Sequence, residues 1–311
     1  MRGVKMTTDG IRLVPPAGDP VEGTVRVAVA SSGICGSDLH LASMGPSWAI
    51  LGHEFSGTLD DGTAVAVLPV VRCGSCDRCL AGAESQCRNA LGAMYGVSLD
   101  GGLADEAWVD PSCAVPLPDG LAIEHANLVE PLAVALHGIH RSGVVDGMRI
   151  LVLGAGPIGL CAIAAARHLG AAVDLEGHRA TRLAAGERLG ASMAVGTDYD
   201  VVLDAAGTQS SLDRATEAAR PGGTIGILGT YWSPVELGLA FQMKELTLLP
   251  SFTYGHHHGV QEFADATQVL RATPDLPDAL VTHRFGLDEA AEAFRVAADR
   301  DEDPIKVVVH P

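Results

Sequence analysis

Four cysteines crowded into a short stretch are the residues whose types and spacing most clearly suggest chemistry: Cys73, Cys76, Cys79 and Cys87. Their C-x2-C-x2-C-x7-C spacing, with Gly74 and Gly82 allowing tight turns, suits a closed tetrahedral site of four thiolates. Four protein ligands leave no open position on the metal, so the expected zinc ion is structural. Buried or disulfide-paired cysteines are the alternative. An iron–sulfur cluster is disfavoured because its usual spacing and trailing proline are missing.

A second set of metal-binding residue types lies upstream, in Cys35 and in the pair His53 and Glu54. A thiolate, an imidazole and a carboxylate would leave a zinc ion with an exchangeable position, which is the arrangement of a catalytic zinc. Taken alone, these residues could equally belong to a core.

A glycine-rich loop follows an apolar run at 150–153. It consists of Gly154, Ala155, Gly156, Pro157, Ile158 and Gly159, and it leads into an Ala-rich helix. A G-x-G-x-x-G loop between a buried strand and a helix is typical of dinucleotide binding. Its glycines let the pyrophosphate approach, and the helix N-terminus stabilises the negative charge. An ordinary strand-to-helix turn is the alternative.

The elements that would position these residues change in type along the chain. Up to about residue 125, Gly and Pro break the sequence into short strand-like runs, which indicate a β-rich domain. Beyond Glu124, helical stretches alternate with short apolar strands at 149–153, 172–175, 201–203, 224–228 and 246–249. That alternation predicts an α/β fold with a Rossmann-type doubly wound parallel sheet at 126–256. Residues 1–125 and 257–311 are expected to form the other domain, which ends in a helix at 288–298 and a strand at 305–309.

The order of these motifs along nearly the whole chain resembles the zinc-containing medium-chain dehydrogenase/reductase family. The matching segments are C-G-S-D-L-H at 35–40, G-H-E at 52–54, the four-cysteine segment, E-P-L-A-V-A-L-H at 130–137 and the glycine loop. The segments T-H-R-F at 282–285 and L-D-E-A at 287–290 resemble the family's return strand and helix. The resemblance implies a GroES-like catalytic domain beside the Rossmann domain, and two zinc ions per chain.

The resemblance also implies a role for each matching residue. The catalytic zinc would be bound by Cys35, His53 and Glu130, with Glu54 beside the metal and able to exchange with water as a ligand. Asp38 would accept a hydrogen bond from the distal nitrogen of His53. Ser37 and His40 would carry the proton between the substrate hydroxyl and solvent; without the family, they would be interpreted as a loop hydroxyl and a surface histidine. Ala206 and Gly229 follow later strands, where the family lines the nicotinamide and the adenosine with backbone.

The residues after the second strand of the nucleotide domain favour NADP(H) over NAD(H). NAD-binding sites of this fold place an acid there, ~20 residues beyond the glycine loop, to hold the adenosine ribose. Here that position is Gly177, followed by His178, Arg179 and, one turn on, Arg182. A glycine leaves room for a 2′-phosphate and a guanidinium can bind it, which resembles the pattern of NADP-dependent members of the family. If Glu176 or Asp174 served as the ribose acid instead, NAD would be used.

Composition limits the partners and the location. The chain of 311 residues has 21 basic and 38 acidic residues, a formal net charge of −17. Nucleic acid and anionic membranes are therefore poor partners, because phosphate binding requires clustered Lys and Arg. No apolar run approaches the ~18 residues needed to span a bilayer, and no signal-like segment opens the sequence, so we expect a cytoplasmic protein.

A further histidine-rich segment, His256-His257-His258, looks like a metal-binding sequence. Because it is one short internal run after Tyr254-Gly255, we expect a solvent-facing turn.

These observations predict a zinc-dependent oxidoreductase, an alcohol or polyol dehydrogenase. It would move a hydride between a secondary alcohol of polyol, sugar or cyclitol type, or its ketone, and NADP(H). The polyol preference depends on Glu130 alone, because polyol dehydrogenases of the family carry Glu where many simple alcohol dehydrogenases carry Cys. The interval from Cys35 to His53 is several residues shorter than is usual, so the resemblance does not name the substrate.

The family implies a small-molecule alcohol or carbonyl as partner and a homodimer or homotetramer. A non-catalytic NADPH-binding protein and a reductase of activated carbonyl or enoyl substrates are the alternative functions.

Overall fold

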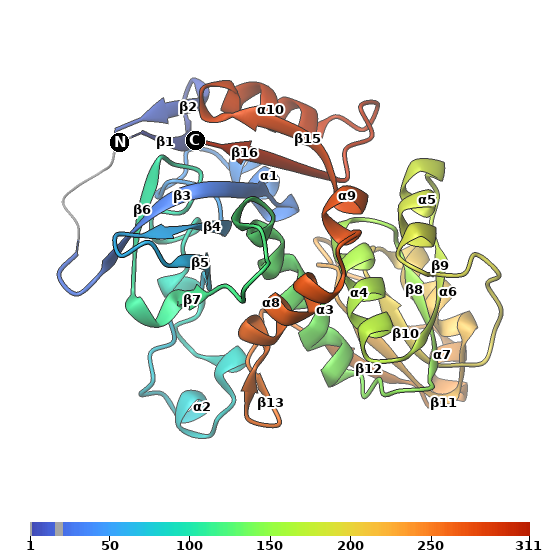
Figure 1. Ribbon diagram of the computed structural model, residues 1–311. Coiled ribbons are helices and arrows are strands. Elements are labelled where there is room, and N and C mark those ends of the chain that lie inside the picture. Colours follow the sequence, from blue (N-terminus) through green and yellow to red (C-terminus); the bar gives the residue numbers. More distant parts are fainter. Residues whose placement is uncertain (1, 16–20) are drawn as a thin grey trace. The chain divides into compact units, whose positions relative to one another are not determined.

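The computed structural model describes residues 2–15 and 21–311, and the chain divides into two compact units (Figure 1). Unit 1 comprises Met1–Glu130 and Val281–Pro311, and unit 2 comprises Pro131–Leu280. Residues 257–280 therefore lie in unit 2, whereas the sequence placed them with the N-terminal domain. The physical reason is that α8 (Glu262–Ala272) and α9 (Leu276–Leu280) pack against α4 (Pro157–His168) of the nucleotide-binding unit.

Unit 1 is built on a mainly antiparallel sheet. Among its described residues the strands run in the order β15-β16-β3-β4-β5-β7, and β6 also pairs with β3. The strands are β3 Val25–Ile34, β4 Glu54–Leu59, β5 Ala64–Val67, β6 Glu106–Val109, β7 Ala114–Pro116, β15 Val281–Gly286 and β16 Lys306–His310. The pairing of β16 with β3 means that a strand near the end of the chain completes a sheet begun near its start.

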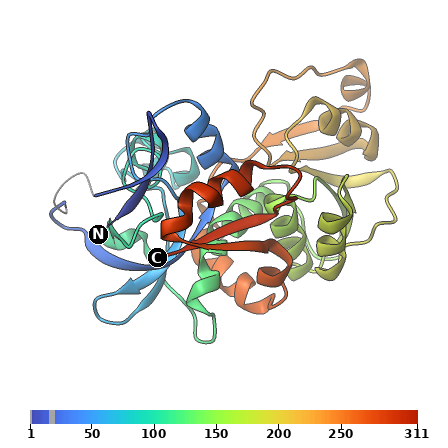
Figure 2. The same ribbon diagram turned by 90° about the horizontal axis from the view of Figure 1, so that it is seen from above.

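Shorter elements surround this sheet. They are the hairpin β1 Gly3–Thr7 and β2 Gly10–Val14, the helices α1 Gly36–Ser43, α2 Asp77–Leu80 and α10 Ala290–Ala298, and the 3₁₀ helices η1 Glu84–Gln86, η2 Leu91–Ala93, η3 Pro111–Cys113, η4 Ile123–Leu128 and η5 Leu287–Glu289. Helix α10 lies along β15 and β16 (Figure 2). Its apolar face, including Ala293 and Phe294, joins Val307 and Val309 of β16 in one core.

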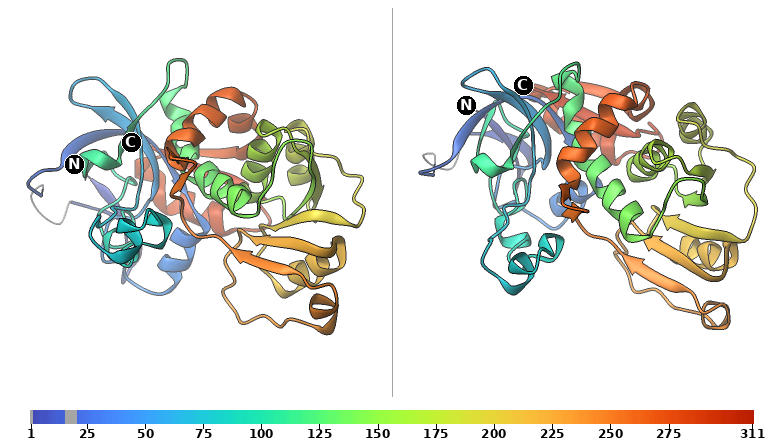
Figure 3. Two further views of the ribbon diagram at one scale, coloured as in Figure 1. Left: turned by 90° about the horizontal axis from the view of Figure 1, so that it is seen from below. Right: turned by 60° about the horizontal axis from the view of Figure 1, so that its bottom comes forward.

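Unit 2 contains a parallel sheet with the strand order β12-β11-β10-β8-β9. Figure 3 shows β10, β11 and β12 side by side. The strands are β8 Arg149–Leu153, β9 Ala172–Glu176, β10 Tyr199–Asp204, β11 Ala219–Ile227 and β12 Thr247–Pro250. From Ile150 to Leu153 every residue of β8 is buried, as an apolar strand covered on both faces requires. The α/β fold predicted from strand–helix alternation is confirmed.

Helices and one small hairpin complete unit 2. They are α3 Val129–Arg141, which begins at the end of unit 1, α4 Pro157–His168, α5 Ala180–Arg188, α6 Gln209–Ala218, α7 Leu239–Met243, α8 and α9, with β13 His256–His257 paired to β14 Val260–Gln261. In the part of the chain that the structure describes, no helix has both the length and the apolar character to cross a membrane.

The sheet of unit 2 lacks one member of the full dinucleotide-binding order 3-2-1-4-5-6. Strands β9, β8, β10, β11 and β12 take the places of strands 2, 1, 4, 5 and 6. Where strand 3 would follow α5, the described residues 189–198 hold only an isolated bridge between Ser192 and Asp174. Unit 2 is therefore one strand shorter than the full six-stranded order.

Candidate functional site

One buried carboxylate connects helix α1 to the turn that carries His53. Asp38 is fully buried in the first turn of α1 and accepts hydrogen bonds from the backbone N–H groups of Cys35 (2.9 Å) and Gly52 (3.3 Å). Gly52 has a φ of 93°, and a Cβ there would lie 2.7 Å from the backbone nitrogen of Leu103. Glycine at this position is therefore needed for the turn that brings His53 to α1.

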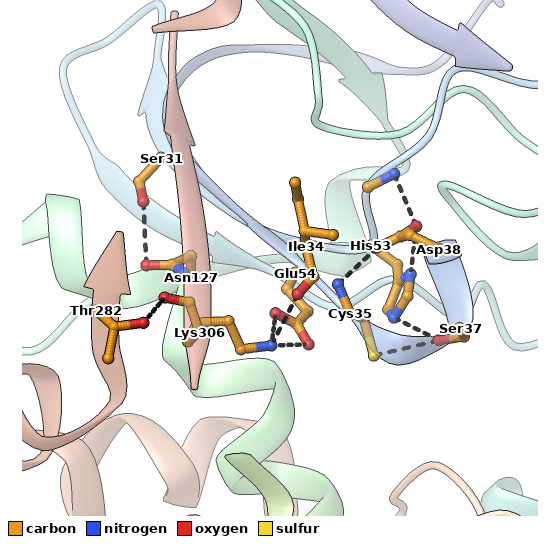
Figure 4. Close-up of polar contacts among 11 residues, drawn as sticks. Ser31, Ile34, Cys35, Ser37, Asp38, His53, Glu54, Asn127, Thr282 and Lys306 are labelled. Atoms are coloured by element: carbon orange, nitrogen blue, oxygen red, sulfur yellow. Dashed lines mark hydrogen bonds and ion pairs between the residues drawn. The ribbon is translucent and has the colours of Figure 1, made fainter. Parts of the chain in front are cut away.

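The structure brings Cys35, His53 and Glu54 together (Figure 4), with one ligand atom of each within 4.8 Å of the other two. His53 Nδ1 lies 3.5 Å from Asp38 Oδ1, on the side away from the thiol, and Nε2 lies 3.4 Å from Ser37 Oγ. Burial lowers the pKa of His53, but the negative charges of Asp38 and Cys35 outweigh it and hold that pKa well above its usual range. A thiolate, an imidazole and a carboxylate, close to the negative charge of Asp38, are donors that fit a zinc ion.

Two polar side chains of α1 extend from this group. Ser37 Oγ donates to Cys35 Sγ at 3.2 Å. His40 follows three residues later, on the same face of the helix, and is half-buried. The proton path expected from the resemblance would thus begin at the metal-binding group and continue one helical turn along α1.

A buried ion pair that the sequence analysis missed holds Glu54. The Lys306 ammonium donates to both Glu54 oxygens, at 2.7 and 2.6 Å, and to the Ile34 carbonyl at 3.3 Å (Figure 4). A Cβ on Gly33 would overlap Glu54 Oε2, so glycine makes room for the pair. A lysine inside the apolar run of β16 was the available signal, because a buried lysine requires a partner.

Glu130, expected as a further ligand of the catalytic zinc, is 7% exposed in the first turn of α3. A carboxylate is stabilised there by the helix N-terminus. Within the described chain, Glu130 is not part of the group whose ligand atoms all lie within 4.8 Å of one another. Direct coordination by Glu130 stays a prediction, and Glu54 is the carboxylate that the structure groups with Cys35 and His53.

The four cysteines of the second expected zinc site also gather, with their sulfur atoms within 4.8 Å of one another. Gly74 and Gly82 have φ values of 64° and 72°, as the expected tight turns require. Hydrogen bonds from neighbouring backbone N–H groups, first that of Ser75, lower the pKa of Cys73 to about 6, whereas burial raises the pKa of Cys79 to about 12. Four convergent sulfurs with no other donor type fit a structural metal site.

The glycine loop between β8 and α4 has two different kinds of glycine. Gly159 lies in the first turn of α4 against the carbonyl oxygen of Gly154, which a Cβ would overlap. Gly156, the N-cap residue, would place a Cβ within 4 Å of no atom. Pro157 and Ile158 then start the helix. The fold needs Gly159, whereas the bare backbone at Gly156 leaves the helix N-terminus open to a phosphate.

The loops after β10 and β11 meet through their backbones. Asp204, fully buried, accepts hydrogen bonds from the N–H groups of Ala206 (2.9 Å) and Gly207 (3.0 Å). A Cβ on Gly229 would lie 2.7 Å from Gly207 N. Ala206 and Gly229 thus present backbone at the carboxyl ends of adjacent parallel strands, where ligands bind in this fold.

Gly177 follows β9 directly, His178 after it is exposed, and Arg179 is the N-cap residue of α5, with Arg182 in its first turn. The two acids that could have held a ribose have other partners. Asp174 is buried and accepts a hydrogen bond from Tyr199 Oη at 2.6 Å. Glu176 accepts from Arg214 Nε at 2.8 and 3.1 Å.

Two family models match the chain, one in each half. Residues 21–119 match an alcohol dehydrogenase GroES-like domain, and residues 157–271 match a zinc-binding dehydrogenase.

Individual relatives extend this likeness to the whole chain. It is 31% identical, over an alignment of 352 positions covering 100% of both chains, to galactitol 1-phosphate 5-dehydrogenase of Escherichia coli (strain K12). Among solved structures it resembles a zinc-binding dehydrogenase from Sinorhizobium meliloti 1021 bound to NADP, with 30% identity and a TM-score of 0.87 over 100% of this chain and 99% of that one. It also resembles the rspB alcohol dehydrogenase of E. coli CFT073 complexed with NADH, with 27% identity, a TM-score of 0.87 and the same coverage.

Proposed function

Because the chain belongs to the zinc-containing medium-chain dehydrogenase family, we propose that it interconverts a polyol-type secondary alcohol and its ketone with NADP(H) as the hydride carrier. The observation that carries the proposal is the group of Cys35, His53 and Glu54 beside the hydroxyl of Ser37. Cys35 and His53, with Glu54 or Glu130 as the carboxylate, would hold the catalytic zinc. Cys73, Cys76, Cys79 and Cys87 would hold a second, structural zinc.

A zinc ion in that group supplies Lewis-acid stabilisation of an alkoxide, and the nicotinamide supplies the hydride chemistry. The protein's own part is to position the substrate hydroxyl and move its proton. Ser37 is placed to accept that proton because its Oγ already lies among the ligand atoms. His40, one turn along α1, would pass the proton towards solvent.

The residues after β9 support NADP(H). The relatives include one solved with NADP and one with NADH, so the choice depends on this chain's own residues. Gly177 carries no acid to repel a 2′-phosphate, and Arg179 and Arg182 supply guanidinium groups nearby. The hydrogen bonds that occupy Asp174 and Glu176 argue against either of them as a ribose acid.

The polyol class is supported by Glu130 and by the sugar-alcohol phosphate named for the E. coli relative. For this chain we propose the polyol class alone, without the phosphate group. The family also favours a homodimer or homotetramer.

Replacing the imidazole ligand tests the mechanism. His53→Ala is expected to lose one zinc per chain and all turnover of polyols and ketones, while NADPH binding followed by nicotinamide fluorescence persists, because the glycine loop lies in unit 2. His168→Ala, an exposed histidine of α4, serves as the control and should keep both metal and turnover. Undiminished turnover in a zinc-depleted His53→Ala protein would contradict the mechanism, and a wild type that binds NADPH but turns over no alcohol or ketone would favour the non-catalytic alternative.

A further inference from the structure

A cluster of histidines around one buried glutamate lies in unit 2, and it shares no residue with the two cysteine-containing groups of unit 1. His137 and His140 are one turn apart on α3, Glu262 begins α8, and His257 lies on β13. Figure 1 shows the β13 hairpin leading into α8, and hydrogen bonds connect α8 to α3. No residue of this cluster belongs to the proposed dehydrogenase site.

The His256–His258 run is only partly the solvent-facing turn expected from the sequence. His256 and His258 are exposed, but His257 is half-buried. Its ring stacks on that of His140, with centroids 3.8 Å apart and planes inclined by 10°. This stacking could not be inferred from the local sequence, because His140 lies more than a hundred positions before His257.

The two oxygens of Glu262, a residue only 2% exposed, have different surroundings. Oε2 lies 2.6 Å from His137 Nδ1 and accepts from the Gly255 N–H at 2.8 Å. Oε1 lies 2.8 Å from His140 Nδ1. Oε2 is thus anchored by two groups, whereas, among the described residues, Oε1 is hydrogen-bonded to the His140 imidazole alone.

We propose that His140, His257 and Glu262 bind one divalent transition-metal ion of the zinc or nickel type. One ligand atom from each of the three lies within 4.8 Å of the other two. Two imidazoles and a carboxylate are a donor set that suits these borderline ions, whereas calcium and magnesium prefer oxygen ligands alone.

The ion takes the place of the proton between His140 Nδ1 and Glu262 Oε1, and that proton is released to solvent. Oε2 meanwhile keeps its bonds to His137 and Gly255, so the carboxylate is already oriented before the ion arrives. His137 is therefore a positioning residue and not a ligand.

His257 completes the site by turning. Two parallel, stacked rings cannot direct nitrogen lone pairs at one ion, so the ring of His257 rotates out of the stack as the ion binds. The ring is only half-buried and lies on a two-residue strand, so the rotation disrupts no core packing.

Nickel titration of the full-length protein carrying only the two zinc ions expected at the cysteine-containing groups, with the proposed third site empty, tests the proposal, and isothermal calorimetry gives stoichiometry and affinity. Any exchange of nickel at the cysteine-containing groups contributes equally to all variants. Wild type is expected to bind one equivalent more than His257→Ala, a variant of a half-buried hairpin residue that should fold normally. The matched control is His256→Ala, which removes an exposed imidazole from the same strand and should titrate like wild type.

His137→Ala provides a second, independent measurement. It should keep the extra equivalent but bind it about 10–100-fold more weakly, as loss of a partner that orients a ligand does. The proposal is overturned if His257→Ala and wild type take up nickel with equal stoichiometry and affinity. It is equally overturned if His256→Ala loses the extra equivalent too, because the hairpin would then bind metal without the cluster.

Discussion

Lys306 and Glu54 are charged side chains only 2% and 1% exposed, brought together from positions 252 residues apart. Removing two charges from water is costly, and their attraction compensates only when the geometry is good and the remaining hydrogen-bonding groups are satisfied. Here the ammonium donates to both carboxylate oxygens and to the Ile34 carbonyl, so its donors are used. The pair fixes the Glu54 carboxylate beside the metal-binding group and competes with a metal ion for its oxygens.

Lys306→Met is expected to destabilise the protein by about 3–5 kcal/mol, because it leaves the Glu54 carboxylate buried without its partner. Denaturant unfolding measures the loss. The double variant Lys306→Met/Glu54→Gln should recover part of it, since no isolated charge then remains. Lys5→Met serves as the control for a half-buried lysine that has no ion-pair partner among the described residues: it loses only the hydrogen bond to the Trp48 carbonyl, with an expected change of about 1 kcal/mol. A Lys306→Met protein as stable as wild type would show that the pair contributes nothing.

Arg179→Ala should raise the KM for NADP(H) markedly and leave the KM for NAD(H) nearly unchanged, because only the 2′-phosphate needs the guanidinium. Steady-state kinetics with both cofactors measures the effect. Arg188→Ala, at the exposed end of the same helix, should alter neither value. Better use of NAD than NADP by the wild type would contradict the cofactor assignment.

At the scale of elements, the loop between β8 and α4 contains one glycine that folding requires, Gly159, and one that cofactor binding requires, Gly156. Gly159→Ala is expected to lower the free energy of unfolding, since its Cβ overlaps the Gly154 carbonyl oxygen and must push α4 off β8. Gly156→Ala should leave stability almost unchanged because its Cβ meets nothing, yet weaken cofactor binding by obstructing the pyrophosphate. Thermal unfolding and NADPH titration of both variants check the pair. Equal loss of stability in the two would refute the distinction.

Local patterns predicted the elements well because the physics behind them is local. The glycine loop, the buried strand before it and the cysteine turns depend on residues within a few positions of one another. Contacts across long stretches of chain could not be predicted in the same way. The Lys306–Glu54 pair and the stacking of His257 on His140 each depend on how distant elements pack, and no spacing rule encodes that.

The missing third strand also escaped the sequence analysis. Alternating strands and helices predict a doubly wound sheet, but the alternation does not say which place in the sheet each strand takes. In the structure, β9 is an edge strand, and the isolated bridge between its Asp174 and Ser192 is the pairing found on its outer side. A short connection therefore lies where a third strand and its helix would be.

At the scale of the whole molecule, the two expected zinc sites lie in unit 1 and the dinucleotide loop lies in unit 2. Ligands that bind only the folded state stabilise the part that binds them. We therefore expect hydrogen exchange of the intact protein to separate the two effects. NADP(H) should slow amide exchange most around β8 and α4, whereas a zinc chelator should speed exchange around α1 and the four-cysteine segment. Uniform changes throughout the chain with either treatment would show that the units open only together.

The sheet of unit 1 is formed by two separate stretches of sequence. Strand β16 pairs with β3, and the whole of unit 2 lies between them in the sequence. On a ribosome that adds about 5–20 residues per second, β3 waits roughly ten to fifty seconds for its partner strand to be made. Unit 2 is continuous and can collapse during that interval, while the end of β3 that pairs with β16 has an unpaired edge. An unpaired strand edge invites pairing with another chain, so we expect the nascent chain to be most prone to aggregation before β16 is made.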